Sequence, residues 1–256
     1  MVDTREEIGD SREEMTTDER WDSRTRLLLG DEAMKRLGRA HVLVVGVGGV
    51  GGYAAEMLAR TGVGHLTLID ADTVAESNLN RQIIALRPDL GRPKVELFAE
   101  RIARISPDIH VKARREFVDP ENVDALLDEG EIDFVIDAID TVAPKVSLIV
   151  SAMRRGMNII SSMGAGGRVD PTKVGYFDLW ETREDGLARA VRQRLKRLGV
   201  RRPLRVVAST EAPRSSAVID LDLRNKRSSY GTIATIPSLF GILLANHVIL
   251  KIVDKR

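Results

Sequence analysis

The residues of this chain that could carry chemistry begin with a glycine-rich turn. Gly46, Gly48, Gly49 and Gly51 stand between a short β-branched run and a helical stretch. Glycines let the backbone approach phosphates closely, and the free amide groups at a helix start attract anions. Asp70 follows the next β-branched run, where a carboxylate can accept hydrogen bonds from ribose hydroxyls. The spacing predicts a nucleotide site without selecting the nucleotide.

The polar segment after Asp70 favours ATP over NAD. It contains Asp72, Asn78, Asn80 and Arg81, and Lys94 follows at the start of the next predicted helix. A dehydrogenase needs no amide and arginine cluster beside the ribose carboxylate. A reaction in which the α-phosphorus of a triphosphate is attacked does, because charge accumulates on the phosphates. We therefore expect these side chains to hold the nucleotide, with Arg81 and Lys94 taking part in catalysis.

Two acids follow a third buried run, Phe134 to Ile136. Asp137 and Asp140 should lie at the carboxyl edge of the sheet, where ligands bind in open α/β folds. Carboxylates there are costly unless a cation or hydrogen bonds hold them. Magnesium prefers oxygen ligands and substrate phosphates, so Asp140 is the predicted metal ligand and Asp137 a predicted cofactor contact. The alternative for Asp140 is a helix cap before Pro144.

Strands and helices alternate along the chain in the way that positions such residues. Strand-like runs are expected at 41–45, 65–69, 109–113, 134–136, 157–161, 173–177 and 204–207, and helices at 93–105, 120–127, 144–155 and 187–198. This alternation predicts an α/β fold with a doubly wound, mostly parallel sheet and a Rossmann-like nucleotide-binding half. Residues 210–229 show no regular pattern, so the C-terminal part is expected to be irregular and to end in a buried helix at 236–253. Whether residues 210–229 cover the pocket stays open.

The N-terminal region divides into a tail and a helix. Residues 1–20 are acidic and lack apolar periodicity, so we expect a disordered tail, followed by a single domain over residues 21–256. Apolar residues from Leu27 to Leu37 recur at helical spacing. They predict one helix, which places Arg24 just ahead of it or within it.

Composition excludes several function classes. With 43% hydrophobic and 30% charged residues and a net charge of +1, the chain resembles an ordinary globular protein. It has no cysteine, so disulfide, thioester and persulfide chemistry are excluded. Neither a signal peptide nor an uninterrupted apolar run long enough to span a membrane is visible. We expect a cytoplasmic protein without a membrane partner.

The ordered motifs resemble those of the ubiquitin-activating-like superfamily, which includes the adenylyltransferases of thiamine and molybdopterin biosynthesis. Within it, the chain is most similar to the family of tRNA threonylcarbamoyladenosine dehydratases. That similarity rests on Ala59 to Gly64, Ile136 to Asp140, Gly164 to Gly167 and Ser209 to Glu211. It extends over nearly everything from Arg24 to the C-terminus.

The resemblance implies a role for each matching residue. Asp70 would hold the ribose, Asn78, Arg81 and Lys94 the phosphates, and Asp140 the magnesium ion. Arg24 matches an arginine that superfamily members extend into the partner subunit's site, which implies a homodimer. The cofactors implied are ATP and Mg²⁺, and the sequence leaves the identity of any monovalent cation open.

The reaction implied is an ATP-dependent dehydration of threonylcarbamoyladenosine in tRNA. The threonyl carboxylate would attack the α-phosphate of ATP, and the ureido group would then close on the acyl carbon and expel AMP. Ring closure needs no protein thiol. Some relatives carry cysteines linked to sulfur metabolism, but this chain has none, so a cysteine desulfurase partner is not expected.

A tRNA substrate requires a basic surface. Nine Lys and Arg residues crowd residues 183–205, and Arg224, Lys226 and Arg227 form a second group. The aromatic candidates for stacking are few, namely Tyr176, Phe177, Trp180 and Tyr230. The four histidines lie in apolar runs and are interpreted as structural.

Other functions remain open at this point. One is an adenylyltransferase that activates the C-terminus of a ubiquitin-like sulfur-carrier protein. A second is a non-catalytic, nucleotide-gated module that binds tRNA. A dehydrogenase is the weakest alternative, because the polar segment after Asp70 does not fit it.

Overall fold

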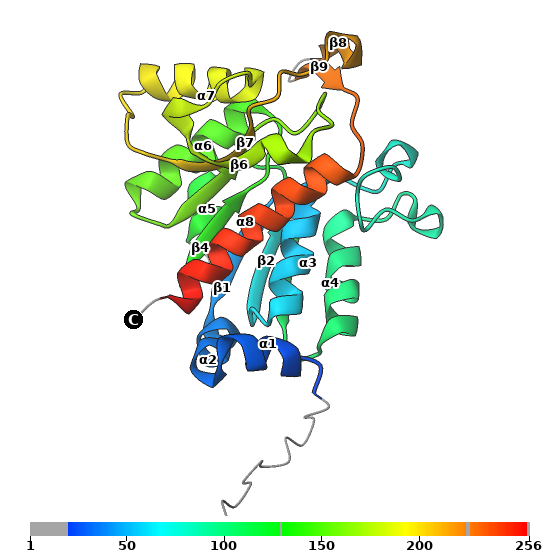
Figure 1. Ribbon diagram of the computed structural model, residues 1–256, viewed down its shortest axis with the longest axis vertical. Coiled ribbons are helices and arrows are strands. Elements are labelled where there is room, and N and C mark those ends of the chain that lie inside the picture. The colour runs from blue at the N-terminus through cyan, green and yellow to red at the C-terminus, as the bar shows by residue number, and fades with distance from the viewer. Residues whose placement is uncertain (1–19, 129, 224–225, 255–256) are drawn as a thin grey trace, which may run out of the picture.

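A seven-stranded sheet forms the centre of the molecule (Figure 1). The computed structural model describes residues 20–128, 130–223 and 226–254; all but the last residue of the predicted tail at 1–20 lie outside these ranges. The strand order is β3-β2-β1-β4-β5-β7-β6, and every pair is parallel except β6 and β7. The strands are β1 (His41–Val45), β2 (His65–Ile69), β3 (His110–Arg114), β4 (Phe134–Asp137), β5 (Ile159–Ser162), β6 (Val174–Asp178) and β7 (Arg205–Ser209). The predicted doubly wound, mostly parallel sheet is confirmed.

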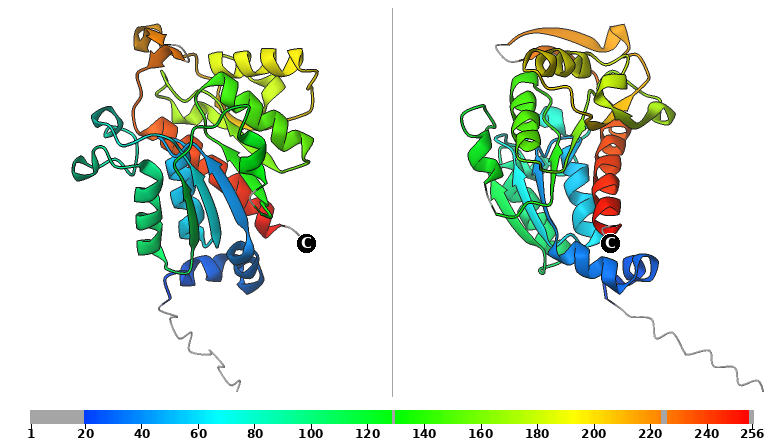
Figure 2. Two further views of the ribbon diagram at one scale, coloured as in Figure 1. Left: turned by 180° about the vertical axis from the view of Figure 1, so that it is seen from behind. Right: turned by 90° about the vertical axis from the view of Figure 1, so that its left-hand side faces the viewer.

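Helices cover both faces of this sheet (Figure 2). One face carries α3 (Gly51–Thr61), α4 (Lys94–Ile105) and α8 (Thr235–Val253), which share a hydrophobic core with β1 and β2. The other face carries α5 (Val123–Leu127) and α6 (Val142–Arg154), and α7 (Gly186–Arg197) packs against α6 in a second core. Short 3-10 turns lie at Glu76–Asn78, Arg87–Asp89, Pro171–Lys173, Leu179–Glu181 and Ser215–Ala217.

The N-terminal region departs from the prediction of one helix. It forms α1 (Ser23–Leu29) and α2 (Asp31–Arg39), separated at Gly30, whose φ of +80° interrupts the helix. Leu27 and Leu28 are 75% and 82% exposed, so they are not part of the apolar face that α2 buries. Periodicity alone missed the break because the apolar spacing continues across Gly30.

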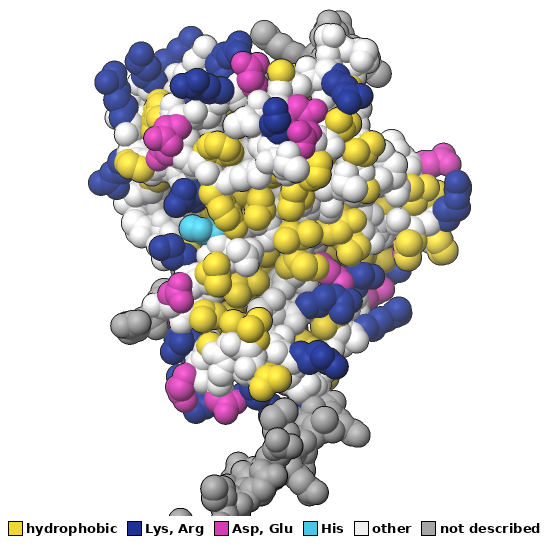
Figure 3. All heavy atoms as spheres, viewed as in Figure 1, with side chains coloured by type: hydrophobic (Ala, Val, Ile, Leu, Met, Phe, Trp, Pro, Cys, Tyr) yellow, Lys and Arg dark blue, Asp and Glu magenta, His cyan; other side chains and the backbone are white. Residues whose placement is uncertain are grey.

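The closing helix α8 matches the prediction and lies along α3. Gly241 makes the close approach possible, since a Cβ there would stand 2.2 Å from the Val50 carbonyl oxygen. By length and composition α8 is apolar enough to cross a membrane, but it buries one side against α3 and the sheet. Its outer side leaves Ile242 and Leu250 exposed, and Figure 3 shows a band of apolar side chains over α8.

Residues 210–229 are more regular than expected. After a 3-10 turn they form an antiparallel hairpin, β8 (Val218–Leu223) and β9 (Lys226–Tyr230), at the end of the molecule where the sheet strands terminate (Figure 1). The prediction of an irregular segment is therefore wrong. Arg224 lies outside the described residues.

Three of the histidines form a column at the start of the sheet. His41, His65 and His110 occupy paired positions on β1, β2 and β3, with ring centroids 6.3 Å and 5.0 Å apart. The His41 ring hydrogen-bonds through Nδ1 to the Glu131 carbonyl at 3.2 Å and through Nε2 to the Thr67 hydroxyl at 2.8 Å. His41 thus fastens the segment before β4 to β1.

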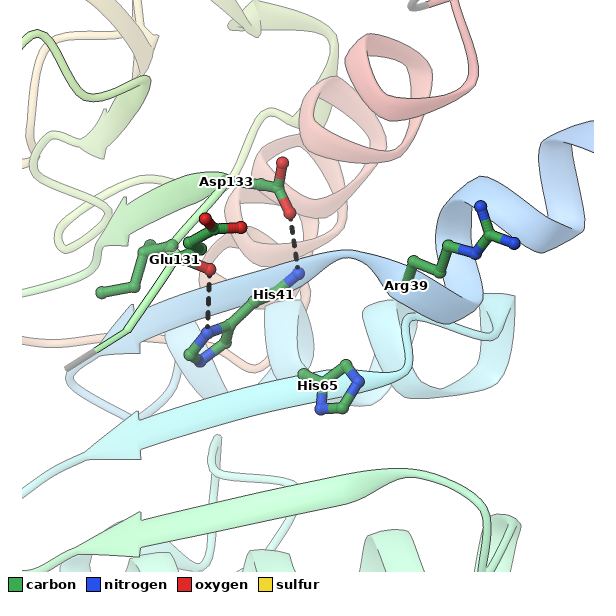
Figure 4. A pocket seen from close by; sticks show the side chains of 6 residues that line it. Arg39, His41, His65, Glu131 and Asp133 are labelled. Carbon is green, nitrogen blue, oxygen red and sulfur yellow. Dashed lines mark hydrogen bonds between the residues drawn. The ribbon is translucent and has the colours of Figure 1, made fainter.

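A cavity of about 300 Å³ opens beside this column (Figure 4). Arg39, His41 and His65 line one side, and the segment from Glu131 to Asp133 lines the other. Burial lowers the pKa of His41, while the hydrogen bond to the Glu131 carbonyl opposes this shift only in part.

Acid should therefore destabilise the fold through His41. A free histidine has a pKa of about 6.5, so around and below that pH the unfolded chain binds more protons than the folded chain does. The free energy of unfolding should fall as the pH is lowered from 7.5 to 5.5. Urea unfolding should show a smaller fall for His41→Asn than for His110→Asn, which alters an exposed ring of the same column. Equal pH dependence in the two variants would contradict this reasoning.

Candidate nucleotide site

The glycine-rich turn joins β1 to α3 and presses against the end of β4. Gly46 has a φ of +84°, and a Cβ there would stand 2.9 Å from the Ala138 carbonyl oxygen. At Gly51 a Cβ would stand only 1.8 Å from the Gly46 carbonyl oxygen. Both glycines are therefore needed for the turn itself. No side chain caps α3. The Gly52 amide donates to the Gly48 carbonyl oxygen at 3.0 Å, so an anion would meet the amides between Gly48 and Gly51.

Side chains from the polar segment lie over the middle of this turn. A Cβ at Gly48 would stand 3.5 Å from Gln82 Nε2, and a Cβ at Gly49 would stand 3.4 Å from Arg81 Cγ. Pro237, at the start of α8, is 3.5 Å from the Gly49 position. Gln82 is buried and its Oε1 has no hydrogen-bond partner. Gln82 Nε2 can donate to a phosphate, and the unpaired Oε1 can accept from a hydroxyl group of the same ligand, so this polar cradle fits a nucleotide.

Asp70 lies at the end of β2 and contacts the glycine turn directly. Its Oδ2 accepts a hydrogen bond from the Val47 amide at 2.8 Å, and its Oδ1 accepts one from the Asp72 amide at 2.9 Å. Burial raises the pKa of Asp70, while the Lys94 ammonium and these amides oppose that shift. Each carboxylate oxygen keeps a lone pair for another donor, such as a ribose hydroxyl.

Lys94 is buried rather than a surface lysine. Its side chain is 4% exposed, and Nζ lies 2.8 Å from Asp72 Oδ2, whose side chain is 71% exposed. The ammonium is thus held at the same strand end as Asp70. The prediction that it could reach a ligand at this edge agrees with that position.

The amides of the polar segment have separate local roles. Asn78 is buried and its Oδ1 accepts from the Ala75 amide at 3.1 Å, which shapes the 3-10 turn. Asn80 donates through Nδ2 to the Thr232 carbonyl at 3.0 Å, a residue far along the chain. Arg81 donates to the Ser77 carbonyl and to Asn80 Oδ1. Asn80 therefore connects the predicted phosphate side to the segment between β9 and α8.

Asp137 is fully buried, and its contacts are internal. Its Oδ2 accepts from Lys145 Nζ at 2.7 Å and from Ser161 Oγ at 2.5 Å, while Oδ1 accepts from the Ile139 amide at 3.1 Å. Lys145 also donates to the Ser162 carbonyl. This geometry makes Asp137 a support for the turn at 138–140, rather than a direct contact to a ligand.

Asp140 is the last residue of that turn and is exposed at the strand edge. Among the described residues, no group of three or more His, Cys, Asp or Glu side chains is placed to hold a metal ion. A magnesium ion bound here would therefore draw its other ligands from phosphates and water, as is usual for this ion. One exposed carboxylate next to a phosphate cradle fits that donor set.

Arg24 lies at the opposite end of the sheet from the glycine turn. It is an exposed residue of α1, and Trp21 near it packs toward Gly62 at the end of α3. The five residues of β1 alone separate this end from the glycine turn by roughly 16 Å. The structure does not bring Arg24 to its own chain's site.

The predicted basic surface centres on α7. Arg192 is the exception, because it donates to the Leu179 carbonyl at 3.1 Å and to the Thr182 hydroxyl. The remaining basic side chains of this region are exposed: Arg183, Arg189, Arg194, Lys196, Arg197, Arg201, Arg202 and Arg205. Figure 3 shows Lys and Arg side chains gathered on the surface over α7.

A buried arginine attaches α7 to the loop after β5. Arg168 donates to the carbonyls of Gly164, Glu184 and Glu211, and its side chain is 2% exposed. Asp185 accepts from the Gly164 amide through Oδ2 and caps α7 through Oδ1. The start of the basic helix is therefore fixed to the strand edge that carries the site.

Sequence reasoning missed Lys145 and Arg168 as organising residues. Lys145 stands alone within an apolar helical run, and a lone lysine among buried positions signals a buried partner. Arg168 offers no such signal, because its partners are mostly backbone carbonyls from three separate segments. Only the fold brings these together.

Comparisons with known proteins agree with this geometry. The family model described as the ThiF family matches residues 23–256. The chain is 37% identical to a tRNA threonylcarbamoyladenosine dehydratase of Bacillus subtilis, covering 90% of this chain and 93% of the relative. It is 40% identical to the Escherichia coli protein of the same name, covering 90% and 92%.

A solved structure of one of these relatives is similar to this chain in fold as well as in sequence. The crystal structure of the E. coli tRNA N6-threonylcarbamoyladenosine dehydratase in complex with ATP matches with a TM-score of 0.84 and 39% identity. The match covers 91% of this chain and 94% of that one.

Replacing Lys145 with methionine should strongly destabilise the chain. The change leaves the Asp137 carboxylate buried without its cation, which costs about 3–5 kcal/mol when a buried pair is broken. Urea unfolding measures the loss. The matched control is Lys35→Met, which removes an exposed partner of Glu32 and should change stability by about 1 kcal/mol or less. Similar effects of the two substitutions would refute the role given to Lys145.

Proposed function

Because this chain belongs to the ThiF family, we propose that it uses ATP to dehydrate threonylcarbamoyladenosine in tRNA. The observation that carries the proposal is the similarity to dehydratases over nine-tenths of the chain, including one solved with ATP. The glycine turn, Asp70 and Lys94 supply the chemistry that a nucleotide needs at the strand edge. The enzyme is thus an adenylating enzyme whose substrate is tRNA.

The reaction has two steps. A threonyl carboxylate oxygen attacks the α-phosphorus of ATP, a new oxygen–phosphorus bond forms, and pyrophosphate leaves. The ureido group then closes on the acyl carbon, loses a proton to solvent, and breaks the bond to AMP. Relative to the neutral acid, the nucleoside loses one water in total. One carboxylate oxygen leaves on AMP, one proton is lost when the acid ionises, and one proton leaves the ureido nitrogen.

Each site residue has a proposed part in these steps. Asp70 orients the ribose, and the amide groups of the glycine turn receive the phosphates. Arg81, Asn78 and Lys94 counter the charge that develops on the phosphates. Lys94 suits this role because burial beside Asp72 restricts where its ammonium can move.

Asp140 is the proposed magnesium ligand. Magnesium there would neutralise phosphate charge and orient pyrophosphate as the leaving group. Asp137 and Lys145 keep the turn before Asp140 in place.

The exposed face of α7 is the proposed tRNA surface. Phosphates bind such clusters through charge, and the contact weakens with salt. Arg192 is not part of this surface, because its guanidinium donates to the Leu179 carbonyl within the protein. We place the enzyme in the cytoplasm, on the basis of a tRNA substrate.

A homodimer completes the proposed site. Arg24 lies too far from its own chain's glycine turn, so it can serve a site only in a second copy. The apolar band over α8, with Ile242 and Leu250, and the exposed Leu27 and Leu28 beside Arg24 offer the surfaces for this contact (Figure 3).

The decisive experiment supplies tRNA that carries threonylcarbamoyladenosine, with ATP and magnesium. Mass analysis of the nucleosides should show a loss of one water, with one AMP formed per nucleoside. Unchanged nucleoside mass sinks the proposal. If the chain exchanged pyrophosphate with ATP only when a small carrier protein was present, and not with tRNA, it would instead be an adenylyltransferase for that carrier protein.

Substitutions at the phosphate side should abolish turnover without unfolding the chain. Asp140→Asn weakens the proposed magnesium site, and Arg81→Ala removes a positive charge beside the phosphates, so AMP release should fall by at least about 100-fold. Circular dichroism should be unchanged, and Lys35→Ala on α2 serves as the control. If either variant kept full turnover, the assignment of that residue would be wrong.

Mixed dimers test the shared site. Arg24→Ala and Asp140→Asn should each be inactive alone. Random reassortment makes half the dimers mixed, and each mixed dimer has one intact site. AMP release should therefore recover to about one quarter of the wild-type rate. A mixture that stays inactive would rule out a contribution of Arg24 to the partner's site.

A further inference from the structure

The described part of the chain leaves one of the four candidate stacking aromatics open to a ligand at the strand edge. Phe177 and Trp180 pack against the core between α6 and α7. Tyr176 donates its hydroxyl to the Leu243 carbonyl on α8 at 2.7 Å. Tyr230, at the end of β9, is 40% exposed.

Glycines form the seat on which the Tyr230 side chain lies. A Cβ at Gly166 would stand 2.4 Å from Tyr230 Cβ, and one at Gly167 would stand 3.4 Å from its ring. The Tyr230 hydroxyl is 3.9 Å from the Cβ position of Gly186, the first residue of α7. Side chains at Gly166 or Gly167 would displace the ring, so the glycines define where it lies.

This seat adjoins the nucleotide site. Gly166 belongs to the loop after β5, and β5 pairs with β4, the strand that leads to Asp140. Two residues beyond Tyr230, the Thr232 carbonyl accepts the hydrogen bond from Asn80. The ring therefore lies between the predicted phosphate side of the crevice and the start of the basic helix.

Charge around the ring suits a nucleic acid strand. Arg189 lies one turn into α7, and Arg183 lies just before this helix. Arg214 lies beside Gly167, and all three arginines are exposed. The Arg214 amide donates to the Gly167 carbonyl at 2.9 Å, which fixes its backbone beside the seat. A planar ring among exposed arginines is the arrangement that single-stranded RNA contacts use.

We propose that the Tyr230 ring is the platform on which the adenine of the modified nucleoside stacks. The inference rests on the proposed function and adds the residue that positions its substrate. The reacting carboxyl carbon is four bonds from the adenine N6, a reach of about 5 Å at ordinary bond lengths. A base stacked on Tyr230 can thus direct its carboxylate toward the glycine turn, while Arg183 and Arg189 meet the flanking phosphates.

The test compares Tyr230→Leu, which keeps an apolar side chain on the glycine seat, with Tyr230→Phe, which keeps the ring. Stacking on a base contributes enough that kcat/KM for the modified tRNA should fall by about 10- to 100-fold in the leucine variant. The phenylalanine variant should stay within about twofold of wild type, since the ring is retained. The affinity for ATP, measured by calorimetry without tRNA, should be unchanged in both. Phe117→Leu, a change at another exposed ring, is the control and should leave kcat/KM unchanged.

The outcomes separate this inference from the proposed function. Wild-type chain that fails to dehydrate the tRNA sinks the proposed function. Active wild type with a leucine variant of equal kcat/KM overturns the stacking role alone. A leucine variant that loses ATP affinity in parallel would assign Tyr230 a structural role, and a phenylalanine variant as defective as leucine would assign the effect to the hydroxyl.

Discussion

The close contact between the glycine turn and the end of β4 is the constraint on which the site depends. Gly46 admits the Ala138 carbonyl only because it lacks a side chain. Asp137 holds the turn at 138–140 in place, and the buried Lys145 fixes the Asp137 carboxylate. Burying an ion pair costs solvation, which satisfied hydrogen bonds offset. Here the pair holds the turn at 138–140 where it meets the glycine turn.

A second buried arrangement sets the position of the basic helix. One carboxylate, Asp185, caps α7 with one oxygen and holds the Gly164 amide with the other. Arg168 closes the arrangement by binding carbonyls on three segments. Because both side chains are buried and fully engaged, α7 cannot shift without moving the loop that seats Tyr230. If tRNA binds along α7, as proposed, these contacts fix its position relative to the glycine turn.

Much of this fold follows from local patterns in the sequence. The strand–turn–helix unit around Gly46 and the carboxylate position of Asp70 could be read directly, because parallel strands bring their ends to one edge. The break at Gly30 and the hairpin of residues 218–230 could not. The first is hidden by continuous apolar spacing. In the second, apolar and acidic residues alternate from Ile219 to Leu223, but the partner strand from Lys226 to Tyr230 is almost entirely polar, so only half of the hairpin carries a strand pattern.

The site was predictable in its residue types and less so in its contacts. Asp137 and Asp140 look alike in sequence, yet one is buried against Lys145 and the other is exposed. That difference depends on Lys145, which lies on α6 eight residues beyond Asp137. The contact between Asn80 and Thr232 joins segments 152 residues apart, so no local pattern could show it.

The last helix has a consequence for how the protein is made. Pro237 touches the glycine turn and Gly241 packs on the helix that follows it, although the turn itself is complete near residue 51. On the ribosome, the turn and its strand emerge long before α8 does. Until then the outer side of α3 is bare apolar surface, which is prone to aggregation and is a target for chaperones. The proposed site is thus complete only once α8 has been made, and a nascent chain that stops before α8 would hold an incomplete site.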